Sequence, residues 1–302
     1  MLIKFIDIGT LGSVYKAYNL TDKIYCVLKI IKGEFDFQYN EEAKMNEIIN
    51  KIPNKTYFVK TRESFEFYKN NKKYYIFVNE LLGYNLYKFL KYNEFRGFHL
   101  EDIQNIAKQL LTGIKILHKN KIVHTDIKPE NILFTESKCI NVTNKTKLPF
   151  NVSQLSNKQK YKKPYKRLIN TKIKIIDFGN ACKIKDLSSG IETICTRQYR
   201  PPEVILKCEK YDEKVDIWSL GCILLEIYTG QIFFKIDYRD ELADIKHLAN
   251  IEKVCGHYPK WMIEHSTNED LSEIFVKCAK HHFNDYVFLI SNIGSNDQCK
   301  KV

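Results

Sequence analysis

The sequence has no C-x-x-C pair, although nine cysteines are scattered along its 302 residues. An odd, dispersed set of cysteines argues against a disulfide framework and against a cysteine-rich zinc site. It fits a reducing compartment better than an oxidising one.

A leader-like start and long apolar runs are also missing. The first residues, MLIKFIDIGT, do not place a charged segment before a long apolar run, so a signal peptide is not expected. The best candidate for a membrane span, residues 215–234, is interrupted by Asp216 and Glu226, which favours a buried helix. Internal repeats are absent from the sequence as well. We expect an intracellular protein, nuclear or cytoplasmic, without membrane association, and we expect a monomer.

The composition is that of an ordinary globular protein, with 44% hydrophobic and 28% charged residues. The net charge of +12 is concentrated in residues 135–170, which carry nine Lys or Arg against the single acid Glu136. Three interpretations of this segment are open. It is a solvated, mobile loop, or it is an electrostatic docking site for a polyanion, a nucleic acid or a protein partner. The third interpretation is a nuclear-targeting patch.

The hydrophobic pattern changes near residue 82. Before it, short runs of β-branched and aromatic residues predict strands, and one helix is predicted at residues 41–51. The predicted strands cover residues 5–8, 13–18, 25–31, 58–67 and 74–78. After it, apolar residues at helical spacing predict helices at about 101–119 and 214–228. We expect an α+β chain with a small β-rich lobe at residues 1–82 and a larger, mainly helical lobe at residues 83–302 that contains the basic insertion 135–170.

Several polar residues have the spacing of a phosphoryl-transfer site. The segment His124–Asn131 places an aspartate, a lysine and an asparagine on one tight loop. Downstream, Asp177 follows the strand-like segment 173–176. Upstream, Lys29 ends an apolar run and Glu47 lies on the first predicted helix. Phosphoryl transfer needs a carboxylate beside the attacking hydroxyl, oxygen ligands for Mg²⁺, and a cation on the nucleotide phosphates that is held by its own carboxylate.

These motifs occur in the order found in eukaryotic protein kinases, and the resemblance covers essentially the whole chain. Two later segments, Pro201-Pro202-Glu203 and Asp216-Ile217-Trp218-Ser219, extend it. The resemblance implies a single domain with the bilobal protein kinase fold, shortened at its C-terminus. It also implies ATP and Mg²⁺ as cofactors.

By this resemblance, Asp126 orients and deprotonates the substrate hydroxyl, and Lys128 steadies the transferred phosphoryl group. The other groups bind the nucleotide and its metal: Asn131 and Asp177 hold Mg²⁺, and Lys29, paired with Glu47, grips the α- and β-phosphates.

The predicted phosphate loop is incomplete. Residues 7–14 fit G-x-G-x-x-G-x-V with Asp7 in place of the first glycine. We expect this carboxylate to weaken the affinity for ATP without abolishing it. The resemblance places four residues of the loop at the nucleotide: Ile8, Gly9, Gly12 and Val14.

Further residues receive roles by the same resemblance. Glu80 and Leu82 present backbone groups to adenine, next to Asn79 at the gatekeeper position. Thr196 hydrogen-bonds near Asp126 and favours Ser or Thr acceptors. Two more have structural roles: Asp216 binds backbone N–H groups of the catalytic loop, and Glu203 pairs with Lys301, which stands in place of an arginine.

The segments HTDIKPENILF, ELLG and TRQYRPPEVIL, together with a degenerate EHLAMMER signature at residues 247–256, resemble the LAMMER, or CDC-like, kinases of the CMGC group. Residues 180–182 and 196–200 also resemble the SR-protein kinases. The likeness implies Ser/Arg-rich splicing factors as substrates, phosphorylated on Ser or Thr, with autophosphorylation on Tyr. Thr125 stands where most kinases carry an arginine that binds an activation-loop phosphate, so constitutive activity is expected.

A second hypothesis is a pseudokinase scaffold or binding module, which Asp7, Asn79 and the missing C-terminal helix favour. The charge of the chain adds a difficulty to the first hypothesis, because an Arg-rich substrate calls for acidic contacts whereas the most charged segment is basic. We expect those contacts from acids of the larger lobe: Asp237, Asp240, Glu241 and Asp244.

Overall fold

The computed structural model describes residues 1–9, 11–142, 164–187, 194–209, 211–237, 239, 241–267 and 286–287. The chain packs as two compact units. The first consists of Met1–His124, Pro129–Cys182 and Ile227–Gly230, and the second of Thr125–Lys128, Lys183–Glu226 and Gln231–Val302. The predicted boundary at residue 82 does not divide these units, because the first helices after it belong to the same unit as the sheet.

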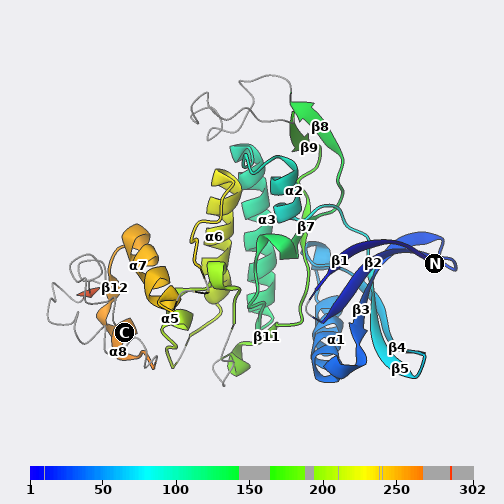
Figure 1. Cartoon of the computed structure of the whole chain (residues 1–302), viewed down its shortest axis with the longest axis horizontal. Coiled ribbons are helices and arrows are strands. Elements are labelled where there is room, and N and C mark those ends of the chain that lie inside the picture. The colour runs from blue at the N-terminus through cyan, green and yellow to red at the C-terminus, as the bar shows by residue number, and fades with distance from the viewer. Residues whose placement is uncertain are drawn as a thin grey trace. The chain divides into compact units, whose positions relative to one another are not determined.

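The first unit begins with a five-stranded antiparallel sheet in the order β1-β2-β3-β5-β4 (Figure 1). Its strands are β1 (Leu2–Ile8), β2 (Gly12–Asn19), β3 (Ile24–Lys32), β4 (Thr61–Lys69) and β5 (Lys72–Glu80). The structure confirms the five predicted strands. These segments form strands because β-branched and aromatic side chains pack well on a pleated surface. The β1 strand is longer than predicted, since Met1 and Tyr18 continue its ladder with two hydrogen bonds of 2.9 Å.

Helix α1 (Asp36–Lys51) covers one face of this sheet (Figure 1). The ring of Tyr39 stacks on that of Tyr75 with 4.1 Å between centroids, and Ile31 and Phe77 complete the buried cluster. The helix begins five residues before its predicted start at residue 41. Packing of Tyr39 on the sheet stabilises this first turn, and a local sequence pattern does not reveal such a contact.

Two helices follow β5. The shorter helix, α2 (Leu86–Tyr92), was not predicted because seven residues are too few for a periodic pattern. Asn85 caps this helix by accepting a 2.6 Å hydrogen bond from the backbone N–H of Lys88. The longer, α3 (Leu100–Lys119), confirms the helix predicted at 101–119. Burial of each large apolar side chain contributes about 1.5–3 kcal/mol. Its fully buried apolar side chains recur every three or four residues: Ile106, Leu110, Ile114 and Leu117.

Short elements complete the first unit. The β7 strand (Ile132–Phe134) pairs with β10 (Ile173–Ile175). Two further short strands are β6 (Ile122–Val123) and β11 (Cys182–Lys183), and Lys183 of β11 belongs to the second unit. The described residues also form the 3-10 helices η1 (Gly33–Phe35), η2 (Lys55–Tyr57) and η3 (Pro129–Asn131), and in the second unit η5 (Ile184–Asp186) and η6 (Arg197–Tyr199).

The basic insertion enters and leaves through the paired strands β8 (Cys139–Val142) and β9 (Tyr165–Leu168). Arg167 of β9 donates to Asp102 at 2.7 and 2.8 Å and to Glu101 at 2.7 Å, so its charge is neutralised within the unit. Six other basic residues of the insertion lie between 143 and 163, outside the described residues. The docking or polyanion site therefore stays a prediction.

The second unit is mainly helical. Its elements are α5 (Pro202–Ile205), α6 (Val215–Thr229, whose last turn is grouped with the first unit), α7 (Ala243–Cys255), β12 (Tyr258–Pro259), α8 (Lys260–Glu264) and β13 (Tyr286–Val287). The α6 helix confirms the one predicted at 214–228. None of the described helices combines the length and apolarity needed to cross a bilayer. Sheet and helices together confirm the α+β class.

His247 of α7 predicts a loss of stability in acid. Its side chain is fully buried, and neither ring nitrogen has a hydrogen-bond partner among the described residues. Burial, with the charges of Arg200 and Arg197, lowers the pKa of His247 to about 4. An unfolded histidine has a pKa of about 6.5, so protonation favours the unfolded state as the pH falls from about 6.5 to 4.

We expect roughly 3 kcal/mol of unfolding free energy to be lost over that range through this residue. Denaturant unfolding gives the free energy of unfolding of the wild type and of His247→Phe at each pH from about 7 to 4. When the two free energies are plotted against pH, the growing difference between the curves measures the loss. Parallel curves would show that His247 does not titrate in the folded protein.

Candidate functional site

A row of four residues crosses the sheet of the first unit. Strand pairing sets Asp7 opposite Val14, Val14 opposite Lys29, and Lys29 opposite Phe77. Residues directly opposite one another present their side chains to the same face of a sheet. Val14 and Lys29, both predicted to bind the nucleotide, therefore lie side by side on the face that α1 also packs against.

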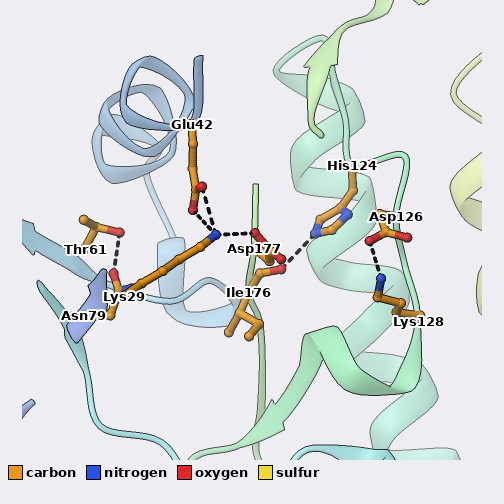
Figure 2. Close-up of polar contacts among 9 residues, drawn as sticks. All are labelled: Lys29, Glu42, Thr61, Asn79, His124, Asp126, Lys128, Ile176 and Asp177. Carbon is orange, nitrogen blue, oxygen red and sulfur yellow. Dashed lines mark hydrogen bonds and ion pairs between the residues drawn. The ribbon is translucent and has the colours of Figure 1, made fainter. Parts of the chain in front are cut away.

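Lys29 is held by two carboxylates (Figure 2). Its Nζ donates to the two oxygens of Glu42 at 2.7 and 2.9 Å and to Asp177 Oδ1 at 2.9 Å. Burial by itself disfavours the charge on Lys29, but Asp177 and Glu42 outweigh it and raise the pKa of Lys29 well above its usual value. Burial raises the pKa of Glu42, and Lys29 opposes that rise. Lys29 therefore remains a cation at neutral pH, as a phosphate-binding residue must.

The predicted pairing of Lys29 with Glu47 is wrong. Glu47 is exposed and pairs instead with Lys51, one turn along α1, at 2.6 Å. Glu42 lies three residues before the buried Met45 and so shares its face, whereas Glu47 lies two residues after Met45 and points to the opposite side. The helical spacing of Glu42 and Met45 could have identified Glu42 as the partner of Lys29. This partner was missed in the sequence because a helix that starts at residue 41 places Glu42 in its first turn.

The predicted metal ligands Asn131 and Asp177 come from two segments that are hydrogen-bonded to each other. The backbone N–H of Ile176 donates to the carbonyl of Asn131 at 2.9 Å. His124 Nε2 donates to the carbonyl of Ile176 at 3.0 Å (Figure 2). The ring of His124 also contacts that of Phe178. Asp177 has a φ of +65°, a left-handed conformation that aspartate adopts more readily than most residues. Asn131 is buried and Asp177 is partly exposed.

This donor set fits Mg²⁺. The ion prefers oxygen ligands and is usually bound through one or two carboxylates together with water and substrate phosphates. The carboxylate of Asp177 and the side-chain carbonyl of Asn131 are such ligands, and Lys29 beside Asp177 supplies a cation for the same phosphates.

The segment predicted to contact adenine begins where β5 ends. Glu80 is the last residue of β5, and Leu82 lies in the coil after it. The side-chain oxygen of Asn79 accepts a 2.8 Å hydrogen bond from Thr61 Oγ1, so the polar gatekeeper residue is bonded within the sheet (Figure 2). The adenine contacts of Glu80 and Leu82 stay a prediction.

The two glycines of the predicted phosphate loop differ in their surroundings. The backbone N–H of Gly9 donates to the carbonyl of Gly12 at 2.8 Å, which closes the turn after the exposed Ile8. A Cβ at Gly12 would lie 1.8 Å from the carbonyl oxygen of Ile30, so close packing of β2 on β3 requires glycine there. A Cβ at Gly9 would meet its nearest atom at 3.8 Å, which leaves the backbone open on that side.

Asp7, the residue expected to oppose the nucleotide, has a cationic partner. Lys88 of α2 lies 2.7 Å from Asp7 Oδ2, and its hydrogen bond and charge lower the pKa of Asp7. Both side chains are exposed, and exposed pairs of this kind contribute about 0–1 kcal/mol. The charge of Asp7 is therefore offset locally by a residue that the sequence motif does not include.

Three predicted site residues of the second unit form a closed cluster. Lys128 Nζ lies 2.7 Å from Asp126 Oδ2 (Figure 2). It also donates to Thr196 Oγ1 at 3.1 Å. The hydroxyl of Thr196 donates to Asp126 Oδ1 at 2.7 Å, which is the contact expected from the sequence. The side chain of Asp126 is 10% exposed, so its charge is shielded from water and faces these two groups.

The residue before Asp126 adopts an unusual backbone conformation. Thr125 has a φ of +63°, which is rare for a β-branched residue and costs about 1–3 kcal/mol. The buried Asp216 at the start of α6 accepts a 2.9 Å hydrogen bond from the backbone N–H of Thr125. On the other side, the carbonyl of Thr125 accepts from the backbone N–H of Cys195 at 2.9 Å. These bonds hold the loop that carries Asp126.

Two expectations for the second unit are settled only in part. Burial raises the pKa of Glu203, but its expected partner Lys301 lies outside the described residues. Among the acids expected to contact an Arg-rich substrate, Asp244 already pairs with Arg197 at 2.5 Å, and Asp240 lies outside the described residues.

Two lysines contact predicted site residues although no pattern singled them out. Lys88 pairs with Asp7, and Lys174 Nζ lies 2.5 Å from Glu80 Oε1. Isolated lysines are common on protein surfaces, so nothing in the local sequence marks these two.

A model of the protein kinase domain matches residues 2–285. The chain is 34% identical over 287 residues to the probable serine/threonine-protein kinase clkA of Dictyostelium discoideum, an alignment that covers 92% of this chain. It is 34% identical over 259 residues to the dual specificity protein kinase CLK4 of Homo sapiens, with 85% of this chain covered. A crystal structure of a kinase domain matches it with a TM-score of 0.77 and 30% identity, covering 92% of this chain and 76% of that one.

The chain spans only 28% and 49% of the lengths of these two curated relatives. The family model extends over nearly all of the residues of this chain, and its fold matches that of a solved kinase domain. The chain therefore belongs to the protein kinase family.

Proposed function

We propose that the chain is an ATP-dependent protein kinase that transfers the γ-phosphoryl group of ATP to serine or threonine of a protein substrate. The observation that carries this proposal is Lys29, a shielded cation bonded at once to Glu42 and Asp177. A structural lysine has no need of two carboxylates from distant segments, whereas a phosphate-binding lysine beside a metal ligand does. The names of the relatives, serine/threonine and dual specificity kinases, support the same activity.

In this proposal the first unit binds the nucleotide. Lys29 binds the α- and β-phosphates, and Glu42 keeps its side chain extended toward them. Asp177 and Asn131 hold Mg²⁺, which neutralises phosphate charge when it is bound. Val14 packs against the base or ribose beside Lys29.

The residues of the second unit act on the acceptor. Asp126 accepts the proton of the attacking hydroxyl, and Lys128 stabilises charge on the transferred phosphoryl group. The bond from Thr196 holds one carboxylate oxygen of Asp126 and thereby orients the other. Asp126 precedes the metal ligand Asn131 by five residues, so the chain itself links the two sets of groups.

For the substrate we propose Ser/Arg-rich proteins, with autophosphorylation on tyrosine. The support is the likeness of residues 124–134, 196–206 and 247–256 to LAMMER kinases and the dual specificity of relatives such as human CLK4. Asp7 and Asn79 no longer favour the alternative of a pseudokinase scaffold. The charge of Asp7 is offset by Lys88, and Asn79 is hydrogen-bonded to Thr61.

A peptide array tests both the proposed kinase activity and the proposed class of substrate. The chain is incubated with Mg²⁺, ATP labelled at the γ-phosphate, and peptides that carry Ser, Thr or Tyr among arginines, each with a lysine-substituted counterpart. We expect label on the Ser and Thr peptides and less on the lysine counterparts, because an ammonium does not reproduce the bidentate contacts of a guanidinium. Label on no peptide would overturn the kinase proposal, and equal label on arginine and lysine peptides would overturn only the substrate class.

The Asp7–Lys88 pair predicts a small, salt-dependent effect on nucleotide binding. Lys88→Met leaves the carboxylate of Asp7 unpaired near the phosphate loop, so we expect ATP to bind up to about fivefold more weakly at low salt. The double variant Asp7→Asn/Lys88→Met removes both charges and should bind as the wild type does. Titration calorimetry at low and high salt measures these affinities, and the effect should shrink as salt rises. Equal losses in the single and double variants would contradict the charge argument.

A further inference from the structure

The side chain of Glu80, at the end of β5, is held by two donors. Lys174 Nζ lies 2.5 Å from Glu80 Oε1, and the backbone N–H of Lys60 donates to the same oxygen at 2.7 Å. The backbone N–H of Glu80 donates to the carbonyl of Lys60 at 3.1 Å. The side chains of Lys174 and Glu80 are 17% and 23% exposed, so solvent screens this ion pair much less than the exposed pairs of the sheet.

The same strand that carries Lys174 also anchors the segment before β4. The backbone N–H of Val59 donates to the carbonyl of Ile175 at 3.0 Å, and Phe58 forms a parallel bridge with Ile175. Residues 58–60, Glu80 and β10 therefore form one junction, fastened at one side by backbone bonds and at the other by the Lys174 side chain.

Strand alternation explains why Lys174 is the residue that reaches Glu80. Ile173 and Ile175 are buried on one face of β10, so Lys174 between them points to the other face. The strand leads directly into Asp177, three residues after Lys174. Lys174 thus joins the residue expected at adenine to β10, the strand that ends two residues before the proposed metal ligand Asp177.

We propose that Lys174 is a positioning residue for adenine recognition: through its ion pair with Glu80 it holds the end of β5 on β10 and so sets where the backbone of residues 80–82 meets the base. This inference rests on the proposed function, in which that backbone binds adenine. Lys174 acts through Glu80 and does not itself touch the nucleotide.

Loss of the ion pair has a specific consequence. Without Lys174, the Glu80 carboxylate keeps the Lys60 N–H as a partner but can turn toward water, and the backbone that follows it is released from β10. Hydrogen bonds to adenine depend on that backbone, whereas phosphate contacts at Lys29 do not. Selectivity for the base should therefore change more than overall nucleotide binding.

Calorimetric titration with Mg·ADP and Mg·GDP tests the proposal without requiring activity. For Lys174→Met we expect the Kd for ADP to rise about fivefold while the Kd for GDP stays nearly constant, so the preference for adenine falls. Lys174→Arg should restore the wild-type ratio. The matched control is Lys172→Met, the same substitution at an exposed lysine two residues earlier, which should change neither Kd.

The outcomes separate the two proposals. If the wild type binds ADP and Lys174→Met leaves the ratio of the two Kd values unchanged, the positioning role is overturned and the proposed function stands. If the wild type binds neither nucleotide, the proposed function itself fails. Should Lys174→Met not fold, Glu80→Gln replaces it: this variant keeps the shape of the side chain, removes the ion pair, and must lower the ADP preference in the same way.

Discussion

Asp126→Asn is expected to slow phosphoryl transfer by roughly 10²–10⁴-fold, which is the range that a general base contributes. Asparagine has nearly the same shape as aspartate and can still accept the hydrogen bond from Thr196. It cannot accept the proton of an attacking hydroxyl, and it no longer attracts Lys128. Single-turnover transfer of labelled phosphate to a serine peptide measures the loss.

Nucleotide binding should be spared by the same substitution. The groups proposed to bind ATP lie in the first unit, whereas Asp126 belongs to the second unit and contacts Lys128 and Thr196. The matched control is Asp22→Asn, at an exposed turn aspartate that accepts from Asn19, and its transfer rate should equal that of the wild type. Transfer by Asp126→Asn within about threefold of the wild type would exclude Asp126 as the general base.

Glu42→Gln is expected to lower kcat/KM for ATP by tenfold or more and to reduce the free energy of unfolding by up to about 3 kcal/mol. The substitution removes a buried negative charge from a lysine that is itself mostly shielded. Lys29 then keeps only Asp177 as an acidic partner among the contacts of Figure 2, and it is drawn toward the metal ligand and away from the phosphates. Steady-state kinetics at varied ATP and denaturant unfolding measure the two effects.

Glu47→Gln is the matched control, because it makes the same chemical change five residues along the same helix. Glu47 is exposed and bonded to Lys51, so we expect the free energy of unfolding to change by less than about 0.5 kcal/mol and kcat/KM to stay unchanged. Loss of activity in Glu47→Gln with a normal Glu42→Gln would restore the pairing expected from the sequence and refute the structural one.

The elements of the fold were largely predictable because their signals are local. The strands of the sheet are runs of β-branched and aromatic residues, and α3 repeats its apolar residues every three or four positions. Element ends were less predictable. The first turn of α1 depends on Tyr39 packing on Tyr75, a residue 36 positions away, and the short α2 depends on its Asn85 cap.

The catalytic residues of the loop 124–131 were also predictable, because their spacing in the sequence is local. Asp126, Lys128 and Asn131 lie within six consecutive residues, so their types and order alone indicated phosphoryl transfer. The partner of Lys29 was not local. Helix α1 contains three glutamates, Glu41, Glu42 and Glu47, and the choice between Glu42 and Glu47 depended on which face of the helix turned toward β3.

The amino-acid sequence by itself determined the class of fold, the family and the residue types of the site, since each is written in short-range periodicity or in a compact motif. The tertiary structure alone decided which charges meet: Glu42 with Lys29, Lys88 with Asp7, and Lys174 with Glu80. The physical reason is that an ion pair depends on a few ångströms of distance between side chains that are 13, 81 and 94 positions apart, and only the packed chain sets that distance.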